Sequence, residues 1–228
     1  MHVRRGRAAD PASDRAATDA LVGTVADTGE PGLRVWYPPR HVAFGRRDAH
    51  SEGYDRARSI ARDRGCPPLE RAVGGRAVAF TGTVLAFVHA EPADASEPGV
   101  DSRYEQGSRT LAAALGDCGV DAYRGEPAHA FCPGTHSLRT DGGKVAGLAQ
   151  RVRRDVAVVG GVVLVDDAAA VASILEPVYD ALDVPFDPAS VGSLAEATSG
   201  LDPATVRDRI EATFVGDRAP AVRSVRET

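Results

Sequence analysis

The sequence contains almost no lysine. Of its 27 lysine and arginine residues, 26 are arginine, and the single lysine is Lys144. A lysine ammonium is a compact charge on a flexible stem, whereas an arginine guanidinium is a larger planar fork. A site that needs a small cation beside one substrate oxygen would therefore resist replacement of lysine by arginine. Composition alone leaves open the alternative that one lysine merely survived an arginine-rich codon bias.

The sequence also lacks long apolar runs and metal-binding cysteine patterns. No stretch of about 18 apolar residues occurs, so no transmembrane helix is expected, and residues 1–15 lack the apolar core of a secretory signal. The three cysteines are not spaced as zinc ligands, and their odd number disfavours a disulfide framework. We therefore expect a cytoplasmic protein without a metal or a membrane partner. The net charge of −5 argues against bulk binding of nucleic acid.

The distribution of apolar residues predicts one mixed domain. We expect it to span residues 15–215, between flexible ends at 1–14 and 216–228. Apolar periodicity predicts helices over residues 14–25, 54–64, 103–115, 167–182 and 203–214. It predicts strands over residues 33–37, 42–45, 69–73, 76–89, 120–123 and 156–165. Because strands and helices alternate irregularly, the pattern favours an α+β (mixed α/β) sheet over a strictly parallel, doubly wound fold.

A β-hairpin is predicted around the lone lysine. Residues 136–140 and 143–151 form its two strands, and Asp141-Gly142, a pair favoured in type I′ turns, joins them. Lys144 would then lie near the start of the return strand, between glycines that let a ligand approach the backbone. An ammonium there could polarise a carbonyl group and stabilise an oxyanion. An exposed lysine on a tight hairpin fits the same pattern.

A second glycine-rich segment, residues 71–78 (RAVGGRAV), lies between two predicted strands. Its paired glycines would allow close approach of a ligand. Its flanking arginines could pair with a phosphate or a carboxylate. The segment matches neither the dinucleotide-binding fingerprint nor the Walker P-loop. A hairpin turn without a ligand is the alternative.

The third segment is residues 131–136 (FCPGTH), in which Cys132 lies between an apolar strand and a Pro-Gly turn. A nearby cation or backbone N–H groups could stabilise a thiolate at that rigid strand end. His136 is a candidate general base. A small buried cysteine that only packs is the alternative, and it is the interpretation that we adopt for Cys66 and Cys118.

Cys132 and Lys144 lie twelve residues apart, joined by the predicted hairpin. That connection could bring the thiol and the ammonium to one pocket, where Lys144 would favour the thiolate form of Cys132. The pairing predicts acyl transfer through a thioester, with an apolar slot for the acyl chain.

Together these segments resemble the biotin/lipoate protein ligase and octanoyltransferase superfamily. Residues 71–78 resemble its glycine loop, and residues 143–151 resemble its lysine loop, in which lysine contacts the acyl carbonyl. The position of Cys132 upstream of the lysine loop is most similar to the cysteine-dependent octanoyltransferase and amidotransferase branch. The similarity covers roughly residues 15–215. It implies a single catalytic domain with a central, mixed, largely antiparallel sheet that is flanked by helices.

The resemblance also implies an activity. Such an enzyme moves an octanoyl or lipoyl group from an acyl-carrier donor to a lysine of lipoyl-domain proteins, such as the glycine cleavage H protein or the E2 subunit of 2-oxoacid dehydrogenases. Cys132 would carry the acyl group as a thioester, and Lys144 would polarise its carbonyl. This mechanism requires no metal and no bound cofactor. The substrate-binding residues would be Arg71, Gly74, Gly75, Arg76, Ala77, Val78, His136, Gly147 and Ala149.

Two other functions fit the same resemblance. In an ATP-dependent lipoate–protein ligase, Lys144 would contact an acyl-adenylate, ATP and Mg²⁺ would be required, and Cys132 would only pack. A non-catalytic binder of lipoyl domains would bind its partner without turnover, whatever donor is supplied.

Overall fold

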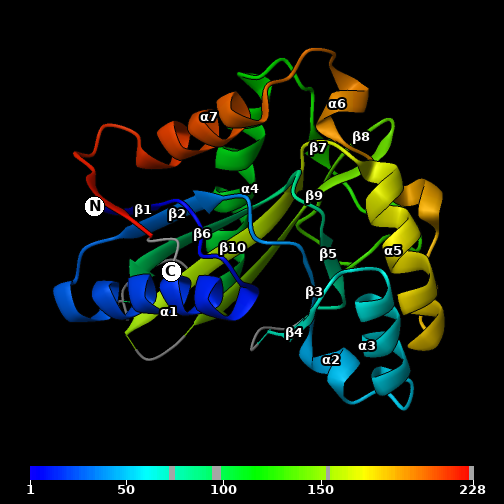
Figure 1. The fold of residues 1–228 in the computed structure, drawn as a ribbon. Helices are drawn as coiled ribbons and strands as arrows, with labels where there is room; N and C mark the ends of the chain where they lie inside the picture. The colour runs from blue at the N-terminus through cyan, green and yellow to red at the C-terminus, as the bar shows by residue number, and fades with distance from the viewer. Residues whose placement is uncertain (72–74, 94–98, 153–154, 226–228) are drawn as a thin grey trace.

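The computed structural model describes residues 1–71, 75–93, 99–152 and 155–225. Its main sheet contains eight strands: β1 (His2–Arg5), β2 (Gly32–Trp36), β6 (Val84–Pro92), β7 (Tyr123–Arg124), β8 (Leu138–Thr140), β9 (Gly143–Val152), β10 (Val156–Leu164) and β11 (Ala221–Ser224). Their order is β11-β1-β2-β6-β10-β9-β8-β7 (Figure 1). β1 pairs in parallel with β2 and β11, and all other neighbours are antiparallel. The sheet is therefore mixed and largely antiparallel, as predicted.

Helices cover both faces of this large sheet. Helix α1 (Pro11–Thr28) lies on one face, and α4 (Val100–Gly116) and α7 (Pro203–Val215) lie on the other (Figure 1). Because side chains alternate along a strand, β2 directs Leu33 and Val35 into the apolar cluster under α4 and α7. It directs Arg34 toward α1, where Arg34 contacts the Asp14 backbone. Within the described residues, no helix is both long enough and apolar enough to cross a membrane.

A small second sheet has the order β4 (Pro68–Glu70), β3 (His41–Phe44), β5 (Val78–Phe80). Helices α2 (Arg46–Ala49), α3 (Tyr54–Asp63) and α5 (Ala168–Ala181) surround it, and α3 packs against α5 (Figure 1). An apolar core that includes Phe44, Ala57 and Leu175 fills the space between them. The 3-10 helix η1 (Pro188–Ser190) and helix α6 (Leu194–Ala197) connect α5 to α7.

Local sequence signals account for the ends of the long helices. The Asp10 side chain accepts the first N–H groups of α1, and Gly29, with a φ of 68°, ends that helix. Asp202 caps α7, with Pro203 at the first helical position, as predicted. Helix boundaries are therefore the part of the fold that single residues determine most directly.

The hairpin that carries Lys144 has the predicted strands but not the predicted turn. Neither Asp141 nor Gly142 has a positive φ, so the turn is not type I′, whereas Gly143 has a φ of 128°. A Cβ on Gly143 would lie 2.7 Å from the carbonyl oxygen of Ser190. Close packing against η1, rather than the preference of an Asp-Gly pair, therefore sets the conformation of this turn.

The structure differs from the sequence prediction at both ends of the chain and before Cys132. Residues 1–14 and 216–228 were expected to be flexible, but β1 and β11 pair in parallel, with His2 opposite Ala221. The pairing joins segments from opposite ends of the chain, which no local pattern records. Residues 128–132 form turns and bends rather than an apolar strand. Their backbone groups bond to a nearby turn, to the Asp187 N–H and to the side chains of Tyr179 and Lys144 instead of to a neighbouring strand.

Candidate functional site

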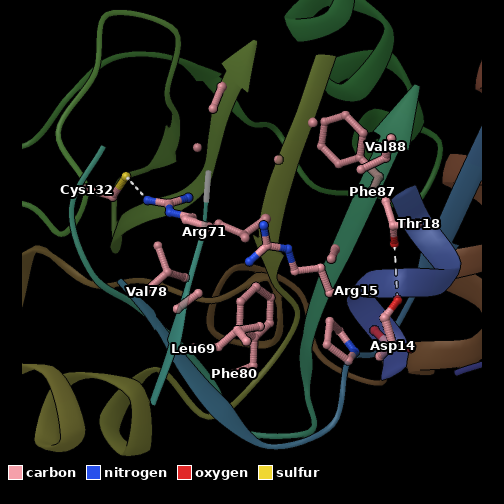
Figure 2. Close-up of a pocket in the computed structure, with 18 of the residues that line it drawn as sticks. Asp14, Arg15, Thr18, Leu69, Arg71, Val78, Phe80, Phe87, Val88 and Cys132 are labelled. Atoms are coloured by element: carbon pink, nitrogen blue, oxygen red, sulfur yellow. Dashed lines mark hydrogen bonds between the residues drawn. The ribbon is translucent and has the colours of Figure 1, made fainter. Parts of the chain in front are cut away.

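A cavity of about 270 Å³ lies between the large sheet, the small sheet and α1. Figure 2 shows Cys132 and Arg71 at one end and Asp14 and Thr18 of α1 at the other. The volume is close to the lower end of the range for ligand pockets, about 300–1,000 Å³. The lining between the two ends is predominantly apolar and includes Trp36, Ala43, Leu69, Val78, Phe80, Ala86, Val88, Phe131, Val158 and Val162. An elongated apolar chain is the kind of ligand that this lining suits.

The Cys132 thiol lies at one end of the cavity beside a cation. Its Sγ is 3.2 Å from Nη2 of Arg71 and 3.4 Å from the backbone nitrogen of Arg76. Both groups donate toward the sulfur, which is the nucleophilic atom of a cysteine. The sequence predicts Lys144 as the cation beside Cys132, whereas the structure places the guanidinium of Arg71 on the sulfur.

The backbone of Cys132 is held in an uncommon conformation. Its φ of 41° is in the left-handed region, which residues other than glycine adopt rarely. The hydroxyl of Tyr179 accepts the Cys132 N–H at 2.6 Å and donates to the Ala77 carbonyl at 3.0 Å. Burial raises the pKa of Tyr179 well above its usual value, so the hydroxyl keeps the proton that it donates. Such over-determined strained residues are typical of functional sites.

The glycine loop lies against Cys132, whereas the sequence predicts only that its glycines allow a ligand to approach. Gly75 has a φ of 93°, and a Cβ on it would lie 2.7 Å from Sγ of Cys132. On the other side of the loop, a Cβ on Gly45 would overlap the Gly75 carbonyl oxygen. A larger residue at either position would displace the loop from the sulfur. Gly74, its predicted neighbour, lies outside the described residues.

Some of the other residues of the glycine loop hold the loop in place, and the rest line the cavity. Arg76 gives its backbone N–H to the sulfur, while its Nη1 lies 3.2 Å from Oδ1 of the buried Asp48. Asp48 also accepts the N–H of Gly45 at 2.9 Å. Its carboxylate therefore connects the start of α2 to the glycine loop. Ala77 is buried, and its carbonyl binds Tyr179. Among the predicted residues of the loop, Arg71 and Val78 line the cavity.

Lys144 is fully buried on β9, behind Cys132. Its Nζ lies 3.0 and 3.2 Å from the two carboxylate oxygens of Glu126. The same atom lies 2.9 Å from the carbonyl oxygen of Phe131 and 3.0 Å from that of Cys132. Burial lowers the pKa of Lys144, and the Glu126 carboxylate opposes that effect. The lone lysine therefore ties down the segment that presents the thiol.

A thin stretch of wall separates the Lys144 ammonium from the cavity. Gly147 and Ala149, two of the predicted substrate-binding residues, line the cavity on β9. A Cβ on Gly147 would lie 3.3 Å from Cε and 3.6 Å from Nζ of Lys144. Gly147 therefore leaves no side chain beside the ammonium, and the ring of Phe131, which also lines the cavity, has its centroid 4.8 Å from Nζ.

His136 lies apart from this arrangement. Its imidazole stacks on Tyr104 with ring centroids 4.2 Å apart, and its Nδ1 lies 3.4 Å from Nη2 of Arg124. Burial and the nearby Arg124 lower the pKa of His136. Among the described residues, His136 neither lines the cavity nor shares a hydrogen bond with Cys132. The structure therefore does not bring the candidate base to the nucleophile.

Three residues of the site were not found from the sequence. Tyr179 lies in a helix that periodicity predicts, but nothing local marks its hydroxyl. Asp48 follows Gly45 by three residues, a spacing typical of a helix capping box. Glu126 precedes a proline in a segment without a motif, so no local signal marks its carboxylate. A buried cation requires a counter-charge, so a search for a carboxylate near the lone Lys144 could have identified Glu126.

The opposite end of the cavity contains a second buried ion pair. Arg34 pairs with the Asp14 carboxylate and also donates to the Asp14 carbonyl, to the Thr18 hydroxyl and to the Gly6 carbonyl. Its guanidinium lies 4.0 Å from the ring centroid of Trp36, whose Nε1 donates to Asp14 at 2.7 Å. This network fastens α1 to β2 and fixes the indole that lines the cavity.

Comparisons with known proteins identify the family of this chain. The family model of the lipoyl protein ligase A/B catalytic domain matches residues 10–215. An octanoyl-[GcvH]:protein N-octanoyltransferase from Geobacillus kaustophilus is 32% identical over 145 residues, which are 63% of this chain and 51% of that protein. The chain thus spans about half the length of this curated relative.

Two solved structures share the fold. A lipoate-protein ligase A bound with ATP superposes with a TM-score of 0.77 at 17% identity, covering 99% of this chain and 89% of the other. A bi-partite lipoate protein ligase from Thermoplasma acidophilum gives a TM-score of 0.70 at 15% identity, with 99% and 87% covered. Since the family model covers most of the chain, the protein belongs to the lipoyl protein ligase A/B catalytic domain family.

Proposed function

We propose that this chain is an acyltransferase that carries an octanoyl or lipoyl group on Cys132 and passes it to a lysine of a lipoyl-domain protein. The observation that carries the proposal is the Cys132 thiol at the end of an apolar cavity, with Arg71 on its sulfur. The name of the relatives, octanoyl-[GcvH]:protein N-octanoyltransferase, supports octanoyl-GcvH as the donor. We further propose that the protein acts in the cytoplasm and requires neither a metal nor a bound cofactor.

The proposed reaction has two steps of acyl transfer. The Cys132 thiolate attacks the carbonyl carbon of the octanoyl amide, a C–S bond forms, and the C–N bond to the donor lysine breaks. The departing amine takes up a proton from water. The amine of the acceptor lysine then attacks the thioester, a C–N bond forms, and Cys132 leaves as a thiolate while the attacking amine loses a proton to water. No net proton or electron is consumed.

The surroundings of Cys132 fit both steps. Arg71 and the Arg76 N–H stabilise the thiolate before attack and again when it leaves. The apolar lining holds the acyl chain and keeps water from the thioester. Lys144 is the cation that would stabilise the oxyanion that forms at the carbonyl in each step, a contribution worth about 10²–10³-fold in rate when a single donor is removed elsewhere.

The experiment is a parallel test of donors with the purified protein. Octanoyl-GcvH, an octanoyl acyl-carrier protein, and ATP with lipoate are each offered together with an apo lipoyl domain, and its modification is followed by mass spectrometry. We expect transfer from an acylated protein donor without ATP. Modification that requires ATP and free lipoate would support a ligase instead. Binding of the lipoyl domain without turnover from any donor would support a non-catalytic binder.

Two variants connect the activity to the nucleophile. Cys132→Ala is expected to abolish transfer, because no thioester can form. Cys118→Ala is the matched control, since Cys118 is also partly buried but packs in the core of the large sheet. Transfer that survives in Cys132→Ala would exclude the thioester route.

A further inference from the structure

The Lys144 ammonium has no free N–H in this structure. A protonated lysine has three N–H donors, and they are directed to Glu126, the Phe131 carbonyl and the Cys132 carbonyl. A substrate carbonyl therefore cannot bind Nζ unless one of these three partners is released. When a substrate carbonyl replaces one of these partners, another partner must keep the ammonium in place.

The three partners are not equivalent. Glu126 is the carboxylate in contact with Nζ, while the other two acceptors are neutral backbone carbonyls. Hydrogen bonds between two charged groups are stronger than those with one neutral partner. Loss of the carboxylate would leave a buried cation without a counter-charge, which is far less favourable than loss of a carbonyl. The carbonyls are therefore the partners that an acyl oxygen replaces.

The position of Glu126 suits this role. Its side chain is 25% exposed whereas that of Lys144 is 0% exposed, so the carboxylate approaches the ammonium from the solvent side. Gly147, which lines the cavity, lies beside the lysine stem, since a Cβ on it would be 3.3 Å from Cε of Lys144. The ammonium is thus bound to the Glu126 carboxylate and lies close to a residue of the cavity wall.

We propose that Glu126 is a positioning residue for acyl transfer: it retains the Lys144 ammonium while that ammonium exchanges one of the Phe131 and Cys132 carbonyls for the acyl oxygen. The inference rests on the proposed acyl transfer through Cys132. The exchange also releases one bond on the segment that carries the nucleophile, so binding of the acyl carbonyl and adjustment of the Cys132 backbone occur together.

Few other charged groups face Lys144. Cys132 is the second group whose charge acts on it, and the Coulombic effect of Cys132, like that of Glu126, favours the protonated lysine. On the neighbouring strand β8, Arg139 is the register partner of Lys144, but its guanidinium lies over the ring of Tyr123. Removal of the Glu126 charge should therefore dominate any change in the titration of Lys144.

The single lysine makes this inference directly measurable. Protein produced with ¹³C-labelled lysine gives one side-chain signal, from Lys144, whose ¹³Cε shift reports its protonation in the absence of any donor. We expect Glu126→Gln, which preserves size, to lower the titration midpoint by about one pH unit or more, a tenfold change in the ionisation ratio. Glu126→Asp, which keeps the charge, should restore part of the shift. An unchanged midpoint in Glu126→Gln would overturn the inference.

Transfer assays complete the test and separate it from the proposed function. Glu126→Gln should lose at least tenfold in transfer rate, and the alkaline limb of its pH–rate profile should move down together with the midpoint of Lys144. The matched control is Glu211→Gln on α7, away from the cavity. This variant breaks the ion pair between Glu211 and Arg5 of β1. It should leave both readouts unchanged, and circular dichroism checks the fold of each variant. A wild-type protein that transfers from no donor refutes the proposed function, whereas transfer at the wild-type rate and pH profile in Glu126→Gln refutes only the role of Glu126.

Discussion

Two fully buried cations, Arg34 and Lys144, lie near opposite ends of the same cavity, and they are built differently. Each side chain is 0% exposed and pairs with one carboxylate. Asp14, the partner of Arg34, is 5% exposed, while Glu126, the partner of Lys144, is 25% exposed. The guanidinium joins acceptors on α1 and the preceding loop, whereas the ammonium binds backbone carbonyls beside the nucleophile.

Under the proposed function, the difference separates a structural ion pair from a functional one. A planar fork with five donors suits Arg34, because several acceptors must be held at once and none needs to change. A single nitrogen on a flexible stem suits the role proposed for Lys144, because it can exchange one acceptor for another without moving its backbone. The proposal would thus account for the one lysine in a chain that otherwise uses arginine, and each prediction below tests one side of the comparison.

The largest expected effect is loss of stability when Arg34 is replaced by methionine. Removal of the guanidinium leaves the Asp14 carboxylate buried without its partner, and breaking such a pair elsewhere costs about 3–5 kcal/mol. Urea denaturation followed by circular dichroism measures the free energy of unfolding. A decrease below about 1 kcal/mol, the range of exposed ion pairs, would show that Arg34 does not fasten α1 to the sheet.

The next largest effect is on the rate of acyl transfer, when lysine and arginine replace each other at the two buried positions. Lys144→Arg should lower acyl transfer per folded molecule by about 10²–10³-fold, because a guanidinium is too large for the position of the ammonium beside Gly147 and Glu126. The matched control is Arg34→Lys, which should lose stability but keep the transfer rate per folded molecule. Near-normal transfer in Lys144→Arg would reduce the lone lysine to a residue left by codon bias.

The smallest effect concerns His89, a buried basic group without a hydrogen-bonded carboxylate. Its Nε2 has no hydrogen-bond partner among the described residues, and burial lowers the pKa of His89 to about 4. Between about pH 6.5 and 4 the unfolded chain binds a proton that the folded chain does not. Stability should therefore be complete above this window and fall by up to about 1.4 kcal/mol per pH unit as the pH drops through it.

Denaturation of the wild type and of His89→Leu across this pH window checks that prediction. The variant should lose the part of the acid slope that His89 contributes. An identical slope in both proteins would mean that His89 is protonated in the folded state, where Oε1 of Glu91 lies 3.8 Å from its Nε2.

Much of the fold was predictable because its signals are local. Apolar periodicity identified the long helices and the buried strand β10, and Asp202 with Pro203 marked the start of α7. The paired ends were not predictable, since β1 and β11 come together from opposite ends of the chain. The turn at Asp141 was predicted with the wrong type, because packing of Gly143 against η1 overrides the local preference.

The site was predictable to the level of segments but not of atoms. Spacing indicated that Cys132 and the lysine strand could share one pocket, and the family resemblance added the glycine loop; the structure brings the three segments together. Spacing could not indicate which cation faces the sulfur, because that depends on side-chain directions: Arg71 reaches Sγ, while Lys144 reaches the carbonyl of Cys132. Tyr179 and Glu126 depend on tertiary contacts, so sequence patterns alone could not assign them.

The most direct test of the account is the mass of the protein after brief incubation with octanoyl-GcvH in the absence of an acceptor. The account predicts one octanoyl group per chain, attached to the peptide that contains Cys132 and released when an apo lipoyl domain is added. It also predicts no adduct in Cys132→Ala. An octanoyl group that persists in that variant, or that maps to another residue, would contradict the central claim.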